Sequence, residues 1–327
     1  MNSVNQYVLA TDLGGTNIRV ALVDRLGNLF YRHSTETLAD RQISDVINSW
    51  TDALKHVMQS VNTKSVIGLG VAFASPIDYQ TGVVYNPPHL SNWDGFSPKS
   101  ILEQNLSMDV TIGNDASLAA FGEYIYGAGR GSKNMVLLTI GTGIGGGIIM
   151  NGELYVGHRG FAGEIGHIVI DRNGPLCDCG TRGCLQSMCS GTAISRIANE
   201  LLVSGKCTIL RDYVSKNQLP VTAQMVVKAA REGDGFATTV LDEVASNLGI
   251  GIAGLIQVFD PEIIIIGGGI SSEFDLLNSS ILKSINMNIY PHLRGVVPVA
   301  KAERGDDAGM LGAAALMFRD KGIEIGI

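Results

Sequence analysis

The chain has 327 residues, which is enough for two domains with sizeable hydrophobic cores. Hydrophobic residues make up 45% and charged residues 17%, as in ordinary soluble globular proteins, and a net charge of −7 without a basic run disfavours broad nucleic-acid binding. The N-terminus carries no signal pattern, and the longest apolar stretches, near 252–258 and 263–266, are too short to span a bilayer. We therefore expect a cytoplasmic protein with no nucleic-acid or membrane partner.

The first predicted strand, 7–11, leads into a glycine turn with the sequence Asp-Leu-Gly-Gly-Thr-Asn, and further strands follow at 18–23 and 28–31. Glycine has no Cβ, so the backbone N–H groups of such a turn can approach phosphate oxygens. A carboxylate repels phosphate, so Asp12 is expected to act through Mg²⁺ or its waters. An ordinary β-hairpin turn is the alternative. The candidate phosphate-binding residues are Asp12, Gly14, Gly15, Thr16 and Asn17.

Residues 42–61 have apolar side chains at helical spacing, which predicts an amphipathic helix with Trp50 in the core. The strand predicted at 66–73 ends in Ala-Ser-Pro, and strand ends in α/β domains commonly face a ligand cleft, which makes Ser75 a candidate. His89 lies in the next predicted loop. It has no partner motif, so we expect a surface or packing residue.

A short strand at 110–112 is followed by Gly-Asn-Asp and by a helical pattern at 116–126. Asp115 therefore lies where a helix begins, and two interpretations stay open. It is either the cap of that helix or a general base at a strand–helix junction. Asn114 beside it is suited to hold a substrate hydroxyl.

A second strand–glycine turn–strand unit starts with the strand 135–140, continues with Gly-Thr-Gly-Ile-Gly-Gly-Gly and ends with 148–150. It has no GxxxxGK[ST] lysine and opens no helix, so it is neither a P-loop nor a dinucleotide fingerprint. Two such units predict an internal duplication, in which two similar domains hold a phosphate chain from opposite sides. Two ordinary hairpins are the alternative. The candidate phosphate-binding residues here are Gly141, Thr142 and Gly143.

A cluster of metal-binding residue types follows, and its members are His167, Cys177, Cys179 and Cys184. Structural zinc takes four tetrahedral nitrogen and sulfur ligands, and the intervening glycines let the chain fold back around one ion. Free buried cysteines are the alternative, and a disulfide is disfavoured in a reducing compartment. The metal would fix the neighbouring polar residues Glu164 and Gln186 in place.

The remaining chain alternates helices and strands. Glycines 249, 251 and 254 in the long helix predict close helix packing, because they lower helix propensity. Gly267, Gly268 and Gly269 end a buried strand and are candidates to receive a flat or phosphorylated group. The predicted helices are 192–203, 222–232, 236–259, 272–285 and 306–319, and the predicted strands are 262–266 and 296–300.

These motifs occur in an order that resembles the ROK family, which comprises sugar kinases and sugar-responsive repressors. The motifs are DLGGT (12–16), GND (113–115), GTGIGGG (141–147), GEIGH (163–167), CDCGTRGCLQ (177–186), FDPEIIIIGGG (259–269) and DDAGMLGAAA (306–315). The resemblance implies a duplicated actin/hexokinase-like, ribonuclease H-like α/β fold of two domains with an interdomain cleft. A small domain would comprise 1–115 with the C-terminal helix, about 307–327, and a large domain 116–306 would carry the zinc.

The resemblance also implies residue roles. Asp115 would be the catalytic base for a sugar hydroxyl. The implied sugar-binding residues are Ser75, Asn114, Asp115, Glu164, His167 and Gln186, with His167 also a zinc ligand. Gly267 to Gly269 would border adenine and ribose. One residue departs from the family pattern, because Gln186 stands where the family has Glu, and this puts the substrate in doubt more than the activity.

The implied function is ATP-dependent phosphorylation of glucose or a related hexose such as allose at O6, with structural Zn²⁺, Mg²⁺ bound with ATP, and a homodimer. Alternatives are an N-acetylmannosamine or N-acetylglucosamine kinase, and polyphosphate as donor. A sugar-responsive repressor is disfavoured, since the first strand begins at Tyr7 and leaves no room for a helix-turn-helix. Asp115 argues against a sugar-binding protein without catalysis.

Overall fold

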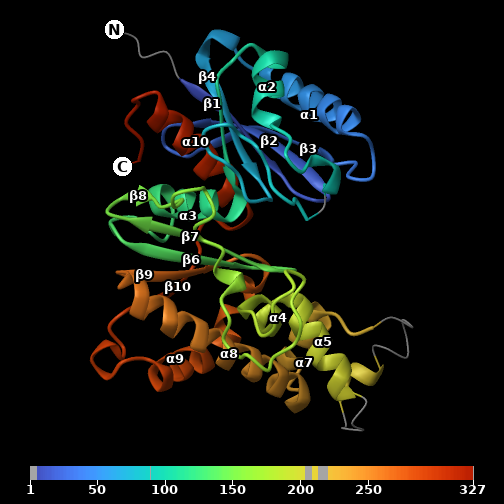
Figure 1. The fold of residues 1–327 in the computed structure, drawn as a ribbon, viewed down its shortest axis with the longest axis vertical. Helices are drawn as coiled ribbons and strands as arrows, with labels where there is room; N and C mark the ends of the chain where they lie inside the picture. The colour runs from blue at the N-terminus through green and yellow to red at the C-terminus, as the bar shows by residue number, and fades with distance from the viewer. Residues whose placement is uncertain (1–5, 89, 203–207, 213–219, 327) are drawn as a thin grey trace. The chain divides into compact units, whose positions relative to one another are not determined.

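The computed structural model describes residues 6–88, 90–202, 208–212 and 220–326 (Figure 1). His89 and the end of the predicted helix 192–203 lie outside the described residues. Contacts group the chain into two compact units. The first comprises 1–133, 147–163 and 303–327, and the second comprises 134–146 and 164–302. The domain boundary expected at residue 115 stays a prediction.

The sheet of the first unit has five strands in the order β3-β2-β1-β4-β5. Its strands are β1 (Tyr7–Leu13), β2 (Asn17–Asp24), β3 (Leu29–Glu36), β4 (Val66–Phe73) and β5 (Val110–Asn114). The first three strands are antiparallel, whereas β1, β4 and β5 run parallel. This arrangement brings the turn after β1 and the ends of β4 and β5 to one edge of the sheet.

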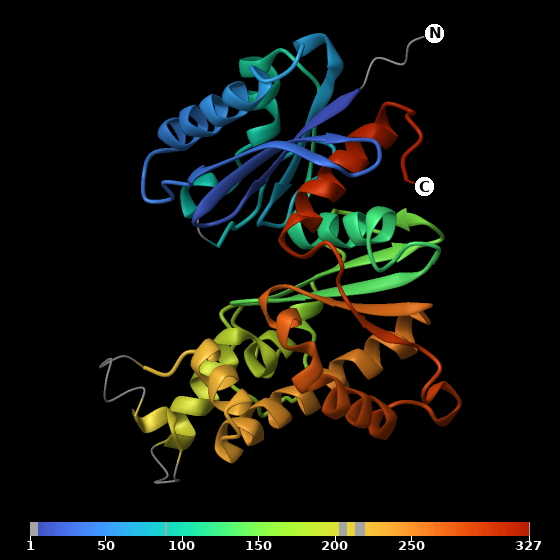
Figure 2. The ribbon, with the colours of Figure 1, turned by 180° about the vertical axis from the view of Figure 1, so that it is seen from behind.

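Helices cover both faces of this sheet. Figures 1 and 2 show α1 (Ile43–Met58) and α2 (Pro98–Leu106) on one face and α10 (Ala308–Asp320) on the other. Helix α3 (Asp115–Tyr126) packs against α10. Trp50 of α1 is fully buried beside Phe73, as predicted from the helical spacing. The core therefore lies directly behind the strand ends that carry the candidate residues.

A fully buried carboxylate, that of Glu123, fastens α3 to the segment before α10. It accepts hydrogen bonds from the backbone N–H groups of Ala128 at 2.8 Å, Glu303 at 3.1 Å and Arg304 at 2.6 Å. Three donors compensate for the removal of the charge from water. The start of α10 is therefore fixed against α3.

The second sheet has the order β10-β9-β6-β7-β8. Its strands are β6 (Met135–Ile140), β7 (Ile144–Met150), β8 (Glu153–Leu154), β9 (Ile263–Gly267) and β10 (Val299–Lys301). Because β7 begins at Ile144, only residues 141–143 of the glycine run form the turn, and the predicted start at 148 is wrong. The helices of this half are α4 (Leu185–Cys189), α5 (Gly191–Leu202), α7 (Ala223–Arg231), α8 (Gly235–Phe259) and α9 (Phe274–Asn288).

Helix α8 is the one helix in the described residues that is long and apolar enough to cross a membrane by length and composition. The expectation that every apolar stretch is too short is therefore wrong for α8. The share of its apolar window that is buried inside the fold is 61%, and it packs against α9, α7, α5 and α4. The helix serves as the core element of the second unit.

The prediction that the glycines of α8 mark close packing is confirmed for two of three. A Cβ on Gly249 would lie 2.5 Å from the Cβ of Ser284 in α9, and one on Gly251 would lie 2.7 Å from Leu185 in α4. A Cβ on Gly254 would meet nothing within 4 Å, so the prediction is wrong there. The first two glycines let neighbouring helices approach α8.

Candidate functional site

The first glycine turn, residues 14–16, joins β1 to β2, and the predicted residues Asp12 and Asn17 lie in these two strands. Gly14 N–H donates to the carbonyl of Asn17 at 3.1 Å. Thr37, which follows β3, donates its hydroxyl to Gly14 O at 2.7 Å and its N–H to Thr16 O at 2.8 Å. Thr37 was not foreseen from the sequence. Thr16 and Asn17 are exposed, so the outer side of the turn is open to a ligand.

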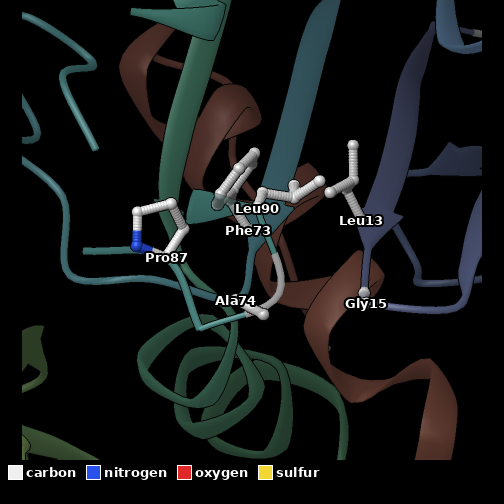
Figure 3. A pocket seen from close by; sticks show the side chains of 7 residues that line it. Leu13, Gly15, Phe73, Ala74, Pro87 and Leu90 are labelled. Atoms are coloured by element: carbon white, nitrogen blue, oxygen red, sulfur yellow. The ribbon is translucent and has the colours of Figure 1, made fainter. Parts of the chain in front are cut away.

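The inner side of this turn is packed. Figure 3 shows the apolar side chains that surround a small cavity behind it, among them Leu13, Phe73 and Leu90. The volume of about 10 Å³ has room for about one water molecule. A phosphate group can therefore approach only from the outer side.

Asp12, at the end of β1, forms an ion pair with Arg19 of β2. Burial raises the pKa of the Asp12 carboxyl, and the positive charge and hydrogen bond of Arg19 oppose that rise. The charge of Asp306 raises the pKa further. Arg19 thus already neutralises part of the negative charge of Asp12. The sequence had predicted that Asp12 acts through Mg²⁺ or its waters.

The junction of β5 and α3 orients the candidate base. Asn114 is the N-cap of α3, because its Oδ1 accepts from Ser117 N–H at 3.0 Å. Its Nδ2 donates to Asp115 Oδ1 at 3.2 Å and to Ser75 O at 3.2 Å. The interpretation of Asp115 as the cap is therefore wrong, and its carboxylate is held by Asn114 and by Ala116 N–H at 2.8 Å.

Ser75 lies close to this junction, but it contacts Asn114 through its backbone carbonyl and not through its side chain. Its side chain is 2% exposed, and its hydroxyl lies 2.9 Å from the carbonyl of Tyr85. The carbonyl of Ser75, in turn, accepts from the amide of Asn114. Tyr79, which the sequence did not indicate, accepts from Asn114 N–H through its hydroxyl at 3.3 Å. A sugar contact of Ser75 stays a prediction.

The four predicted metal ligands come together in the second unit. Their ligand atoms lie within 4.8 Å of one another, with 3.6 Å between the sulfurs of Cys179 and Cys184 and 3.8 Å between Cys177 Sγ and His167 Nδ1. A tetrahedron with zinc bonds of 2.0–2.3 Å has edges of about 3.3–3.8 Å. The cluster therefore fits a structural zinc site.

The loop that carries the cysteines depends on a glycine. Gly183 has φ +69°, and a Cβ there would lie 1.5 Å from Asp171 O. Only glycine fits at this position, as the predicted fold-back of the chain requires. The next residue, Cys184, caps α4, so the metal cluster and this helix are directly joined.

The thiols of the cluster differ in acidity. The N–H of Thr181 lowers the pKa of Cys179 to about 6. Burial raises the pKa of Cys177 and raises that of Cys184 to about 12. Zinc binds thiolates, so metal binding at the two buried cysteines releases protons.

His167 and Glu164 lie on the accessible side of the cluster. His167 turns Nδ1 to Cys177 and Nε2 to Glu164, whose Oε2 is 3.9 Å away. Burial raises the pKa of the Glu164 carboxyl, and the nearby histidine opposes this. A metal on Nδ1 leaves the hydrogen of the neutral ring on Nε2, where it can be donated to a ligand.

The second glycine turn is held by the start of α5. Gly141 O accepts from Gly191 N–H at 2.8 Å, and Thr142 O accepts from the Thr192 hydroxyl at 2.9 Å. The C=O and N–H of a trans peptide point in opposite directions, so the N–H groups of Thr142 and Gly143 point away from these donors. Such paired N–H groups are suited to bind an oxyanion.

A cavity of about 800 Å³ opens beside this turn, between α5, α7 and the 3₁₀ turn Gly269–Glu273. Pockets of this size hold cofactors and drug-sized ligands. Gly141, Thr142 and Gly269 line it, whereas Gly267, the last residue of β9, and Gly268 do not. Of the predicted glycine triplet, only Gly269 therefore borders the space.

Charged side chains that the sequence reasoning missed lie at the rim of this cavity. Arg231 of α7 forms ion pairs with Glu273 at 2.7 Å and with Asp275 at 3.0 Å, and Lys228 lines the same wall. The signal in the sequence was the three-residue spacing of Lys228 and Arg231, which places both side chains on one face of a helix. The sequence predicted a helix that begins at Thr192 but not the contact of this residue with the glycine turn.

Gln186 of α4 reaches the second glycine turn. Its side-chain oxygen accepts a hydrogen bond from Ile144 N–H at 3.0 Å. The sequence assigned this residue to a sugar, and that assignment stays a prediction. The structure adds a contact with the turn that the sequence did not indicate.

A model of the ROK family matches residues 8–320. A glucokinase of Halalkalibacterium halodurans is 37% identical over 96% of this chain and 95% of its own length. The structure of a ROK family glucokinase from Streptomyces griseus in complex with glucose and AMPPNP has a TM-score of 0.81 and 32% identity, covering 95% of this chain and 98% of that one. The xylose repressor of Bacillus subtilis is 28% identical over 95% of this chain and 77% of its own length.

The likeness to that glucokinase structure spans both five-stranded sheets. It confirms the predicted α/β fold of the actin-like, duplicated type. The family match covers nearly the whole chain and includes both glycine turns and the metal cluster. The chain therefore belongs to the ROK family.

Proposed function

We propose that this protein is an ATP-dependent hexose kinase that phosphorylates glucose or a related hexose, such as allose, at O6. The observation that carries the proposal is the cavity of about 800 Å³ with the Gly141–Gly143 turn at its edge. Its size suits a nucleotide. The full-length likeness to glucokinases supports the same conclusion.

In this proposal the nucleotide lies in the cavity, with its base beyond Gly269 and its phosphates at the Gly141–Gly143 turn. The N–H groups of Thr142 and Gly143 donate to phosphate oxygens. The Gly14–Gly15 turn, whose outer side is open, is a further candidate to bind phosphate oxygens. Mg²⁺ bound with ATP would neutralise phosphate charge, and Asp12 would hold its waters.

Asp115 is the proposed general base, which takes the proton from the attacking sugar hydroxyl. Asn114 orients it and hydrogen-bonds the sugar through the remaining lone pair of its Oδ1, and Glu164 and His167 contact further hydroxyls. Phosphoryl transfer depends mainly on positioning and on electrostatic stabilisation. The zinc is structural in this account, because its four protein ligands leave no open position for substrate.

The test is a coupled ADP-release assay with a panel of hexoses and N-acetylhexosamines. We expect turnover with glucose or a close relative, and Asp115→Asn to lower kcat at least ~100-fold while the variant still binds the sugar. Asp109→Asn is the matched control. Asp109 precedes β5 and its side chain is 74% exposed beside Lys321, so this variant keeps wild-type turnover.

Two results would contradict the proposal. A near wild-type rate in Asp115→Asn would remove the assigned base. Absence of ADP release with every sugar, together with sugar-dependent binding of operator DNA in a gel-shift assay, would favour the repressor function of the xylose repressor relative. Turnover restricted to N-acetylated sugars would change the substrate and leave the kinase mechanism in place.

A further inference from the structure

Tyr79 is half-buried in a tight turn that follows β4. Asp78 orders this turn, because its Oδ1 accepts from the backbone N–H groups of Gln80 at 2.8 Å and Thr81 at 3.0 Å. Its carbonyl accepts from Gly82 N–H at 2.7 Å. A side chain that bonds the backbone two and three residues further on fixes a turn locally. The turn therefore presents the ring of Tyr79 from an ordered backbone.

Two glycines allow this turn to pack closely against its neighbours. Gly82 has φ +69°, and a Cβ there would lie 2.4 Å from the Cβ of Lys99 in α2. A Cβ on Gly160, in the segment after β8, would lie 2.2 Å from Ile77 O and 3.3 Å from Tyr79 Cδ2. The turn is thus held between α2 and this segment, which limits its movement as a whole.

The ring of Tyr79 reaches the end of β5. A Cβ on Gly113 would lie 2.7 Å from Tyr79 Cε1, so the ring approaches the strand only because residue 113 is glycine. The hydroxyl of Tyr79 accepts from Asn114 N–H at 3.3 Å. Strand β5 is the outermost described strand of its sheet, and Tyr79 supplies the acceptor that a further strand would supply.

This hydrogen bond fixes the residue that orients the proposed base. Asn114 is extended, with φ −61° and ψ 138°, whereas Asp115 begins α3. The Asn114 side chain donates to Asp115 Oδ1 and accepts from Ser117 N–H. Rotation of the peptide between residues 113 and 114 would turn the N–H away from Tyr79 and redirect this side chain. The direction of the Asp115 carboxylate therefore depends on Tyr79 through Asn114.

We propose that Tyr79 is a positioning residue for the general base, and that it sets the rate of phosphoryl transfer and not the affinity for the hexose. This inference rests on the proposed function, in which Asp115 takes the proton of the sugar hydroxyl. A misplacement of about 1 Å can cost ~100-fold in rate. Hexose affinity is shared among several hydrogen-bonding residues, so it changes less than the rate.

Rapid-quench kinetics test the inference, with enzyme in excess over ATP and with saturating Mg²⁺ and hexose. The hexose is the one that the coupled assay selects, and the single-turnover design removes product release from the measured rate. Tyr79→Phe keeps the ring against Gly113 and removes the hydroxyl. We expect the transfer rate to fall about three- to tenfold, as the loss of one hydrogen bond predicts, while the KM for the hexose stays within about twofold.

Hydrogen exchange of the Asn114 amide, followed by NMR, provides a measurement that is independent of activity. Loss of the acceptor should speed this exchange about tenfold in Tyr79→Phe, because the amide is then open to water more often. The amides of β4 should exchange as in the wild type, since Tyr79 does not take part in the pairing of that strand. An unchanged exchange rate at Asn114 would contradict the contact on which the inference depends.

Tyr126→Phe is the matched control. Tyr126 lies at the other end of α3, and its hydroxyl donates to Arg25 O at 3.4 Å. This variant keeps the wild-type transfer rate and the wild-type exchange of the Asn114 amide. A wild-type transfer rate in Tyr79→Phe, even with a lower melting temperature, or a loss of hexose affinity as large as the loss of rate, would overturn the inference alone. A wild-type protein that phosphorylates no hexose would overturn the proposed function itself.

Discussion

Neighbouring side chains at the junction of β5 and α3 perform different tasks. Asn114 caps the helix, which frees Asp115 from that role, and its amide nitrogen donates to Asp115 Oδ1. Asp115 thus has a fixed orientation in the first turn of α3, where the helix dipole stabilises its negative charge. A proton acceptor must be held in one position, so this arrangement supports the base role that we propose.

The cysteines of α4 and the preceding loop give a test at the residue scale. Cys184→Ser removes one ligand from the metal cluster, and we expect the variant to lose bound zinc and to melt at a lower temperature. The zinc content is measured by inductively coupled plasma mass spectrometry, and wild-type protein should contain about one zinc ion per chain.

Cys189→Ala is the control for this experiment. Cys189 is fully buried one turn further along, outside the metal cluster, so its loss leaves the zinc content unchanged. Wild-type protein that carries no zinc after expression in zinc-supplemented medium would contradict the metal assignment. Full zinc content in Cys184→Ser would exclude Cys184 as a ligand.

At the scale of elements, helix α8 shows how packing overrides helix propensity. Gly249 and Gly251 lie against α9 and α4, whereas Gly254 has open space beside it. A glycine costs a helix about 0.5–1 kcal/mol relative to alanine, and close approach of a neighbour compensates only for the first two. The three glycines therefore differ in the expected effect of the same substitution.

Gly249→Ala should lower the free energy of unfolding by about 1–3 kcal/mol, because its Cβ would lie 2.5 Å from the Cβ of Ser284. Gly254→Ala should raise it by about 0.5–1 kcal/mol, since only the propensity gain remains. Urea unfolding followed by circular dichroism measures both. Equal effects of the two substitutions would show that packing against α9 does not explain Gly249.

The elements that escaped sequence reasoning are short or lack periodicity. Helix α4 has five residues and β8 has two, which is too few for a hydrophobic period. Helix α2 was missed despite Ser97 as its cap and Pro98 at its first position, both of which are start signals. A search for caps as well as for apolar spacing would have found α2.

Across the whole molecule, the two strand–glycine turn–strand units predicted an internal duplication, and the resemblance to the ROK family implied the duplicated α/β fold. The metal cluster was predictable since its ligands lie close together in the sequence. The contact between Gln186 and Ile144 was not, because it joins residues 42 positions apart. The cavity escaped prediction for the same reason, since its walls come from separate segments that carry no shared motif.

Phosphoryl transfer from ATP to a hexose is the central claim, and phosphorus–proton correlation NMR of the product tests it most directly. After incubation with ATP, Mg²⁺ and the best hexose of the panel, the new phosphorus resonance should couple to the two protons on C6. Asp115→Asn should form this product at least ~100-fold more slowly. Coupling to another carbon would move the reaction to a different hydroxyl, and the absence of any sugar phosphate would contradict the account.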